Sequence, residues 1–113
     1  MKIMRNEQKL DQILLDLGHD DFNTGTKYLR VAAMVWDGAA LTKELYPTLA
    51  RVYGTTPSRI ERNIRHSIEK AWHRADWQMQ EKYFGSSVNP RTGKPTNGEY
   101  IARLARLIEV DEE

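Results

Sequence analysis

The sequence predicts an all-α protein with five or six helices around one core. Apolar residues recur at three- and four-residue spacing in several segments, whereas no segment shows the alternation that is typical of a β-strand. Residues that end helices, such as Gly18 and Gly54, stand between these segments. A chain of 113 residues is long enough for one domain with a core but not for two. We therefore expect residues 1–113 to form a single domain, with residues 1–5 and 109–113 frayed.

Composition excludes several classes of protein. The chain has no cysteine, which rules out disulfides, thiolate metal sites and cysteine nucleophiles. No apolar run approaches membrane-spanning length, and the N-terminus lacks the apolar core of a signal peptide. We therefore expect a cytoplasmic protein. The formal net charge of +1 argues against a protein that is basic over its whole surface.

Two amphipathic helices are predicted first. Residues 6–17 carry apolar side chains at helical spacing: Leu10, Ile13, Leu14 and Leu17. Gly18 follows as a natural helix end. After a polar loop, residues 26–36 form the second helix. Its inner stripe consists of Tyr28, Leu29, Ala32, Val35 and Trp36.

The next two segments predict a helix-turn-helix. Residues 41–53 have a stripe made of Leu41, Leu45, Leu49 and Val52, but Pro47 interrupts the pattern. Because proline removes a helix hydrogen bond, we expect either a kink or a one-turn lead-in followed by a fresh helix from Pro47. Gly54 ends this element. A short turn, residues 54–56, then leads into a long helix over residues 57–72, which is helix-turn-helix geometry.

The long helix has a clear start and a clear apolar face. Thr56 is a good N-cap, and Pro57 suits the first helical position, where no N–H is needed. The inner stripe consists of Ile60, Ile64, Ile68, Ala71 and Trp72.

The C-terminal third is predicted to hold two more helices. Residues 76–84 form a short helix in which Trp77, Tyr83 and Phe84 make apolar contacts, and all three tryptophans of the chain are assigned to the core. Residues 88–95 form a loop, because they contain two prolines and a glycine. Thr96 and Glu99 form a capping box that starts the last helix.

The face of the long helix opposite its apolar stripe carries the strongest functional signal. It holds Ser58, Arg59, Arg62, Arg65, His66, Glu69 and His73. Residues 55–74 contain five positive and two negative side chains, a local net charge of +3. Arginine can bind guanine with two hydrogen bonds. Glu61 could accept from the amino group of cytosine or hold an arginine in place.

A second interpretation of this face is a solvated surface with ion pairs between residues four apart, such as Glu61 with Arg65. The preceding turn and the one-sided arginines favour DNA binding. Lys94 lies just before the last helix and is either a phosphate clamp at the helix N-terminus or an ordinary loop lysine.

No arrangement of residues supports catalysis. There is no glycine-rich phosphate loop, nucleophile elbow or pair of catalytic carboxylates. A metal site of His66, Glu69 and His73 lacks a fourth ligand on an exposed helix face. We expect no enzyme activity, no metal and no cofactor.

Several motifs resemble one known family. Residues 55–62 (Thr-Thr-Pro-Ser-Arg-Ile-Glu-Arg) with Ile64-Arg65-His66 are similar to the recognition helix of the C-terminal effector domain of the sporulation master response regulator, the stage-zero A transcription factor of endospore-forming Firmicutes. Further matching motifs follow the same order: residues 27–30 (Lys-Tyr-Leu-Arg), 42–47 (Thr-Lys-Glu-Leu-Tyr-Pro), 83–85 (Tyr-Phe-Gly) and 94–97 (Lys-Pro-Thr-Asn). The resemblance spans roughly residues 10–107.

This resemblance implies a six-helix domain of the winged-helix-like, response-regulator effector type that regulates transcription in sporulation. The helix at residues 57–72 would enter the major groove of double-stranded DNA, as one copy of a tandem dimer. Residues implied to contact DNA are Arg62 and Glu61 at bases, Ser58, Arg59, Arg65 and His66 at bases or phosphates, and Lys94 at a phosphate.

The resemblance also implies that residues 75–84 contact RNA polymerase sigma factor. Trp77, Gln78 and Met79 depart from the family pattern in this segment. The sequence shows no receiver domain of the kind that precedes the effector domain in the family, so we expect either an excised effector domain or a free-standing small protein. This leaves a second hypothesis, in which the chain is a stand-alone protein-binding module or inhibitor that reuses the helix-turn-helix fold.

Overall fold

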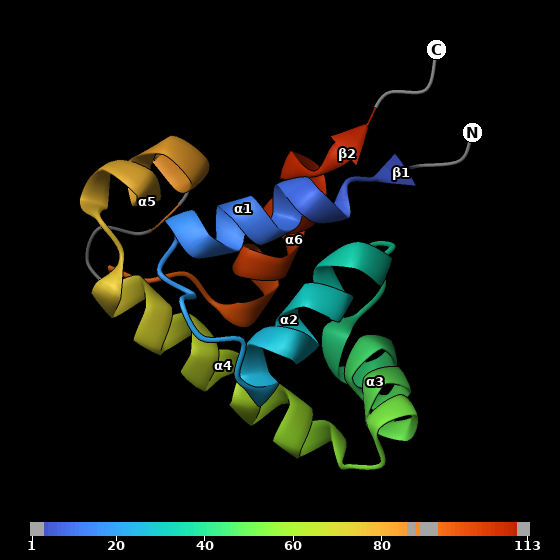
Figure 1. The fold of residues 1–113 in the computed structure, drawn as a ribbon. Helices are drawn as coiled ribbons and strands as arrows, with labels where there is room; N and C mark the ends of the chain where they lie inside the picture. The colour runs from blue at the N-terminus through green and yellow to red at the C-terminus, as the bar shows by residue number, and fades with distance from the viewer. Residues whose placement is uncertain (1–3, 86–87, 89–92, 111–113) are drawn as a thin grey trace.

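Six α-helices and one π-helical turn build the part of the chain that the computed structural model describes, residues 4–85, 88 and 93–110 (Figure 1). The helices are α1 (Glu7–Asp16), α2 (Thr24–Val35), α3 (Tyr46–Tyr53), α4 (Pro57–Arg74), α5 (Trp77–Phe84) and α6 (Asn97–Leu107). The π-helical turn η1 (Leu41–Leu45) precedes α3, and two short strands, β1 (Met4–Arg5) and β2 (Glu109–Val110), lie at the ends. The all-α prediction is confirmed.

The two strands hold the ends of the chain side by side (Figure 1). Met4 lies opposite Val110 in an antiparallel pair, and the backbone N–H of Asn6 donates to the carbonyl of Ile108 at 2.8 Å. We expected frayed ends and no strand, and this is wrong for residues 4–5 and 109–110. The reason is that Ile108 is fully buried, which fixes the end of α6 next to the start of α1. The rest of the predicted frayed ends lies outside the described residues.

The π-helical turn η1 accommodates Pro47. Leu45 donates its N–H five residues back, to Ala40, at 3.3 Å, and Tyr46 donates likewise to Leu41. Pro47 then needs no hydrogen bond, since it lies in the first turn of α3. Of the two alternatives from the sequence, the structure has the lead-in followed by a fresh helix, although α3 begins one residue before Pro47.

Helix α4 runs beneath α2, α3 and α6 and contributes the centre of the core (Figure 1). The predicted apolar stripe is correct, because Ile60, Ile64 and Ile68 are at most 1% exposed. The N-terminus of α2 lies directly on α4. A Cβ atom added at Gly25 would overlap the carbonyl oxygen of Asn63, so only glycine permits this close approach.

Three residues of the predicted apolar stripes are exposed instead of buried. Val35 is 54% exposed, and Val52 and Trp77 are each 69% exposed. Each lies in the first or last turn of its helix, where no neighbouring element covers it. The assignment of Trp77 to the core is therefore wrong. Trp72 is buried as expected, and its indole N–H donates to the carbonyl of Gly93.

A buried polar network connects four parts of the chain. His19, in the loop after α1, is 2% exposed. Its Nε2 atom hydrogen-bonds with the hydroxyl of Tyr100 in α6 at 2.8 Å. Its Nδ1 atom lies 3.2 Å from the hydroxyl of Thr26 in α2 and 3.3 Å from that of Ser67 in α4. The Thr26 and Ser67 hydroxyls hydrogen-bond with each other at 2.7 Å. The network therefore joins α2, α4 and α6 at one point.

Burial, helped by the nearby charge of Arg74 and opposed by that of Asp21, lowers the pKa of His19 to about 4. His19 is thus neutral in the folded protein near pH 7.

We predict that Gly25→Ala lowers the free energy of unfolding by about 2 kcal/mol, because the added methyl group has no room against the backbone of α4. Gly98→Ala is the matched control. Its Cβ would meet the flexible Cδ1 atom of Leu41 at 3.3 Å and Oγ1 of Thr96 at 4.0 Å, and alanine is favoured over glycine within a helix. Urea unfolding of both variants checks this. Equal losses of stability would contradict the tight contact at Gly25.

We also predict that stability falls as the pH is lowered from 6.5 towards 4. The unfolded protein binds a proton at His19 near the ordinary pKa of 6.5, and the folded protein binds one only near 4. The stability contributed by neutral His19 is thus complete above pH 6.5 and is lost below it, by up to ~3 kcal/mol. Urea unfolding of wild type and His19→Gln from pH 7 down to about pH 4 measures this. A stability difference between the two proteins that does not change with pH would exclude His19 as the cause.

Candidate nucleic-acid interface

Helices α3 and α4 form the predicted helix-turn-helix. Helix α3 ends at Gly54, whose φ of 64° and ψ of 41° are left-handed and therefore suit glycine. Thr56 then caps α4, because its side-chain oxygen accepts the backbone N–H of Arg59 at 3.2 Å. Pro57 occupies the first turn. This turn fixes where the N-terminal end of α4 lies on the surface.

The predicted DNA-contacting residues of α4 lie on its exposed face. Ser58, Arg59, Arg62, Arg65 and His66 are exposed, and Glu61 is half-buried at the edge of this face. The inward side of the same helix carries Ser67, which belongs to the buried network around His19. The structure therefore brings together all six of the predicted α4 residues on one side.

The positively charged side chains of α4 differ in whether they form an ion pair with a carboxylate. Among the described residues, Arg59 and Arg62 make no ion pair. The cations further along the helix do: Arg65 pairs with Glu61, Lys70 with Asp21 at 3.2 Å, and Arg74 with Asp20. In the described part of the chain, the two arginines of α4 that form no ion pair thus both lie in its first two turns.

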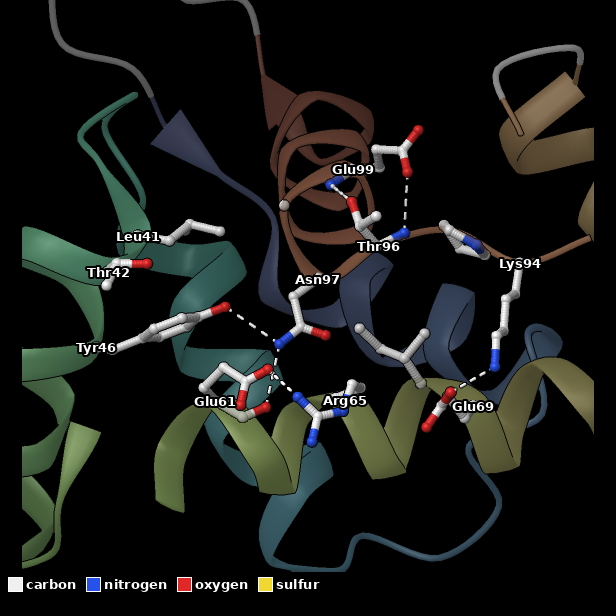
Figure 2. A pocket seen from close by; sticks show the side chains of 13 residues that line it. Leu41, Thr42, Tyr46, Glu61, Arg65, Glu69, Lys94, Thr96, Asn97 and Glu99 are labelled. Atoms are coloured by element: carbon white, nitrogen blue, oxygen red, sulfur yellow. Dashed lines mark hydrogen bonds and ion pairs between the residues drawn. The ribbon is translucent and has the colours of Figure 1, made fainter. Parts of the chain in front are cut away.

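Lys94 faces α4 across a groove (Figure 2). Its Nζ atom lies 2.5 Å from Oε2 of Glu69. Glu61, Arg65 and Glu69 follow one another at four-residue spacing on α4, so that with Lys94 they form a row of alternating charge. We call these four residues the charge row. Hydrogen bonding from Lys94 lowers the pKa of Glu69, and the charges of Arg65 and His66 add to this effect, so Glu69 is a carboxylate.

The groove has a volume of about 680 Å³ and lies between α4, η1 and the start of α6. Its walls carry the charge row together with Tyr46, Thr96, Asn97 and Glu99 (Figure 2). The predicted capping box is present: Thr96 Oγ1 accepts the N–H of Glu99 at 3.2 Å, and Glu99 Oε1 accepts the N–H of Thr96 at 2.9 Å. This cap fixes the start of α6, and Lys94 stands two residues before it.

Asn97 is a residue of this region that sequence reasoning missed. Its side-chain amide donates to the hydroxyl of Tyr46 and to the backbone carbonyl of Glu61, both at 3.1 Å (Figure 2). Asn97 therefore connects α6 with both helices of the helix-turn-helix. An amide at the first position after a capping residue was the available signal, but its partners lie 36 and 51 residues away in sequence.

Comparison with protein families gives a match over residues 10–108 to the family described as sporulation initiation factor Spo0A C terminal. The chain belongs to this family. The matched residues include most of α1 and the whole of α2 to α6, so the match covers the helical core. The resemblance found in the sequence motifs is thereby confirmed.

The Spo0A C-terminal domain is a DNA-binding effector domain that regulates transcription in sporulation, and its family is not a family of enzymes. The helix-turn-helix and the arginines of α4 lie within the matched residues. In the described part of the chain, no three His, Asp or Glu side chains gather closely enough to hold a metal ion. None of the described helices has the length and apolar character to cross a membrane.

Proposed function

We propose that this Spo0A-type domain binds a specific sequence of double-stranded DNA by placing α4 in the major groove. The observation that carries the proposal is the pair Arg59 and Arg62, exposed on the first two turns of α4 and without a carboxylate partner in the described structure. These turns directly follow the helix-turn-helix turn. In proteins of this type, the N-terminal residues of the second helix contact base edges, because the major groove is wide enough to admit a helix.

Arg62 is the candidate for reading a guanine, since it is exposed and its guanidinium has no competing ion pair among the described residues. Arg65 is held by Glu61, and the backbone carbonyl of Glu61 is in turn held by Asn97. We assign Glu61 to the positioning of Arg65, because its carboxylate would otherwise face the phosphates of DNA unpaired. Of the two roles left open for Glu61 by the sequence, the geometry favours this one.

The remaining residues are assigned to the DNA backbone. Ser58, Arg59 and His66 lie on the exposed face of α4 and flank the arginines that face the bases. Lys94 precedes the N-terminus of α6, where the helix dipole adds to the attraction of its charge for a phosphate. Contacts of this kind orient a protein on the duplex but do not read sequence.

Selection of bound sites from a random duplex library tests the proposal. We expect an enriched motif that wild type binds at least about 10³-fold more tightly than random duplex at physiological salt. If no motif is enriched and wild type binds no more tightly than a basic peptide of similar charge, the chain is not a sequence-specific DNA-binding protein.

Two substitutions separate base reading from backbone binding. Arg62→Ala is expected to cost about 1–3 kcal/mol of binding to the selected motif and to relax the preference at one position. Lys94→Ala is expected to weaken binding to all sequences alike and to reduce the slope of log K against log salt by about 0.9. Arg106→Ala, an exposed arginine in the last turn of α6, is the matched control. Fluorescence anisotropy over a salt series measures these effects. A loss that is uniform across sequences for Arg62→Ala would contradict its assignment to a base.

Helix α5 offers a surface for a second function, contact with RNA polymerase sigma factor. The favouring observation is Trp77, which is 69% exposed at the start of α5, because exposed tryptophans are enriched at protein interfaces. Residue Trp77 lies at the end of α4 remote from the helix-turn-helix turn, so both contacts fit on one molecule (Figure 1).

We expect Trp77→Ala to weaken binding to purified sigma factor at least tenfold, as for an interface anchor, and to leave DNA affinity unchanged. Val52→Ala, which truncates an equally exposed apolar side chain on α3, is the control for sigma-factor binding. Surface plasmon resonance with immobilised sigma factor measures the effect. If Trp77→Ala binds sigma factor as wild type does, α5 is not the contact with sigma factor. If the chain binds another protein but neither DNA nor sigma factor, this would favour the stand-alone protein-binding module.

A further inference from the structure

We propose that Glu69 competes with DNA phosphate for Lys94 and thereby limits the affinity of the interface for any duplex. The inference rests on the proposed DNA-binding function and concerns its regulation by a residue of the same face. Glu69 is not a DNA contact in this scheme. It is a carboxylate within the chain that occupies the same cation that a phosphate would occupy.

The geometry of the pair is the first argument. Glu69 Oε2 and Lys94 Nζ are 2.5 Å apart, although the two residues come from different elements and are 25 residues apart in sequence (Figure 2). Lys94 is placed by the capped start of α6, and Glu69 by the fourth turn of α4. A phosphate that approaches the N-terminus of α6 therefore meets a lysine whose charge is already compensated.

The ion pair between Glu69 and Lys94 is weak enough for a DNA phosphate to displace Glu69, so it lowers DNA affinity without preventing binding. The side chains of Lys94 and Glu69 are 53% and 37% exposed, and ion pairs this exposed are weak and screened by salt. The pair can therefore open when a DNA phosphate arrives. The phosphate outcompetes Glu69 because it binds as part of a larger set of contacts.

The charge row gives the released carboxylate another partner. Arg65 precedes Glu69 by four residues, the spacing at which side chains on one helix face meet, and its charge already contributes to lowering the pKa of Glu69. When Lys94 turns to a phosphate, Glu69 can approach Arg65, which Glu61 holds in the absence of DNA. Glu69 thus remains compensated in the complex.

The position of the row relative to the unpaired arginines determines the consequence. Arg59 and Arg62, in the first two turns of α4, have no carboxylate partner in the described structure, so Arg62 is available to a base whether or not Lys94 is paired with Glu69. Lys94 contributes only backbone attraction, which is the same for every sequence. Glu69 therefore lowers binding to random and selected duplexes alike and leaves the sequence preference to the arginines.

The test compares Glu69→Gln with Glu7→Gln. Both substitutions remove one negative charge from an exposed ion pair, since Glu7 pairs with Arg30 at 3.3 Å, but α1 lies away from the exposed face of α4 (Figure 1). Affinities for a random duplex and for the selected duplex are measured by anisotropy at about 0.1 M salt, where the Debye length is about 10 Å. We expect Glu69→Gln to bind both duplexes about two- to fivefold more tightly, and Glu7→Gln to bind them as wild type does.

Two further variants show whether the gain acts through Lys94. The gain from Glu69→Gln must disappear when Lys94→Ala is already present. Glu69→Asp, which keeps the charge but shortens the side chain, must give a smaller gain in the same direction. It also serves as the measurement if Glu69→Gln does not fold.

Three results would overturn the inference: no gain for Glu69→Gln, an equal gain for Glu7→Gln, or a gain that persists without Lys94. Failure of the proposed function would look different. In that case the site selection finds no motif, whereas the failure of this inference leaves a normal motif and normal wild-type affinity.

Discussion

The close contact between the N-terminus of α2 and the middle of α4 is the constraint on which the rest of the structure depends. Gly25 lets the two backbones touch at Asn63, and one turn further on Ser67 enters the hydrogen-bond network of His19, Thr26 and Tyr100. A steric fit and a set of directional bonds therefore fix the same helix. Apolar packing alone would tolerate some rotation of α4 about its axis. The network does not, because turning Ser67 outwards would take a hydrogen-bond partner away from the buried Thr26 hydroxyl.

This fixed rotation decides what the surface presents. With Ser67 and the isoleucine stripe turned inwards, the arginines of α4 can only face solvent, and Asn97 then holds the Glu61 carbonyl from the side of α6. The same arrangement sets the pattern of charge. Carboxylates from α4 itself and from the loop after α1 accompany the later cations of the helix, while the first two turns are left positive. A chain with a net charge of only +1 thus gains a localised basic surface.

The sequence predicted the elements well because they depend on local chemistry. Periodic apolar residues marked each helix, and Thr56, Thr96 and Gly54 marked three of the boundaries. What it could not predict depends on distant neighbours. Periodicity identifies which side of a helix is apolar but does not show whether another element covers each turn, so Trp77 was assigned to the core although it is exposed.

The candidate interface likewise contains features that local sequence predicted and features that depend on distant residues. The residue types and spacing on α4 identified its exposed face, and the spacing of Glu61 and Arg65 identified an ion pair that does form. The pairing of Lys94 with Glu69 and the contacts of Asn97 join segments more than 20 residues apart, and no local pattern encodes them. His19 was likewise unassigned, because its partner Tyr100 is 81 residues away.

The pairing of β1 with β2 has a consequence for how the domain can be attached to anything else. The two strands leave the fold at the same point, next to the end of α6 and remote from the exposed face of α4 (Figure 1). A segment tethered at either end would start from the same side of the molecule and would leave the exposed face of α4 open. A pull on a tether at the C-terminus would be transmitted to α6, which begins at Asn97, shortly after Lys94.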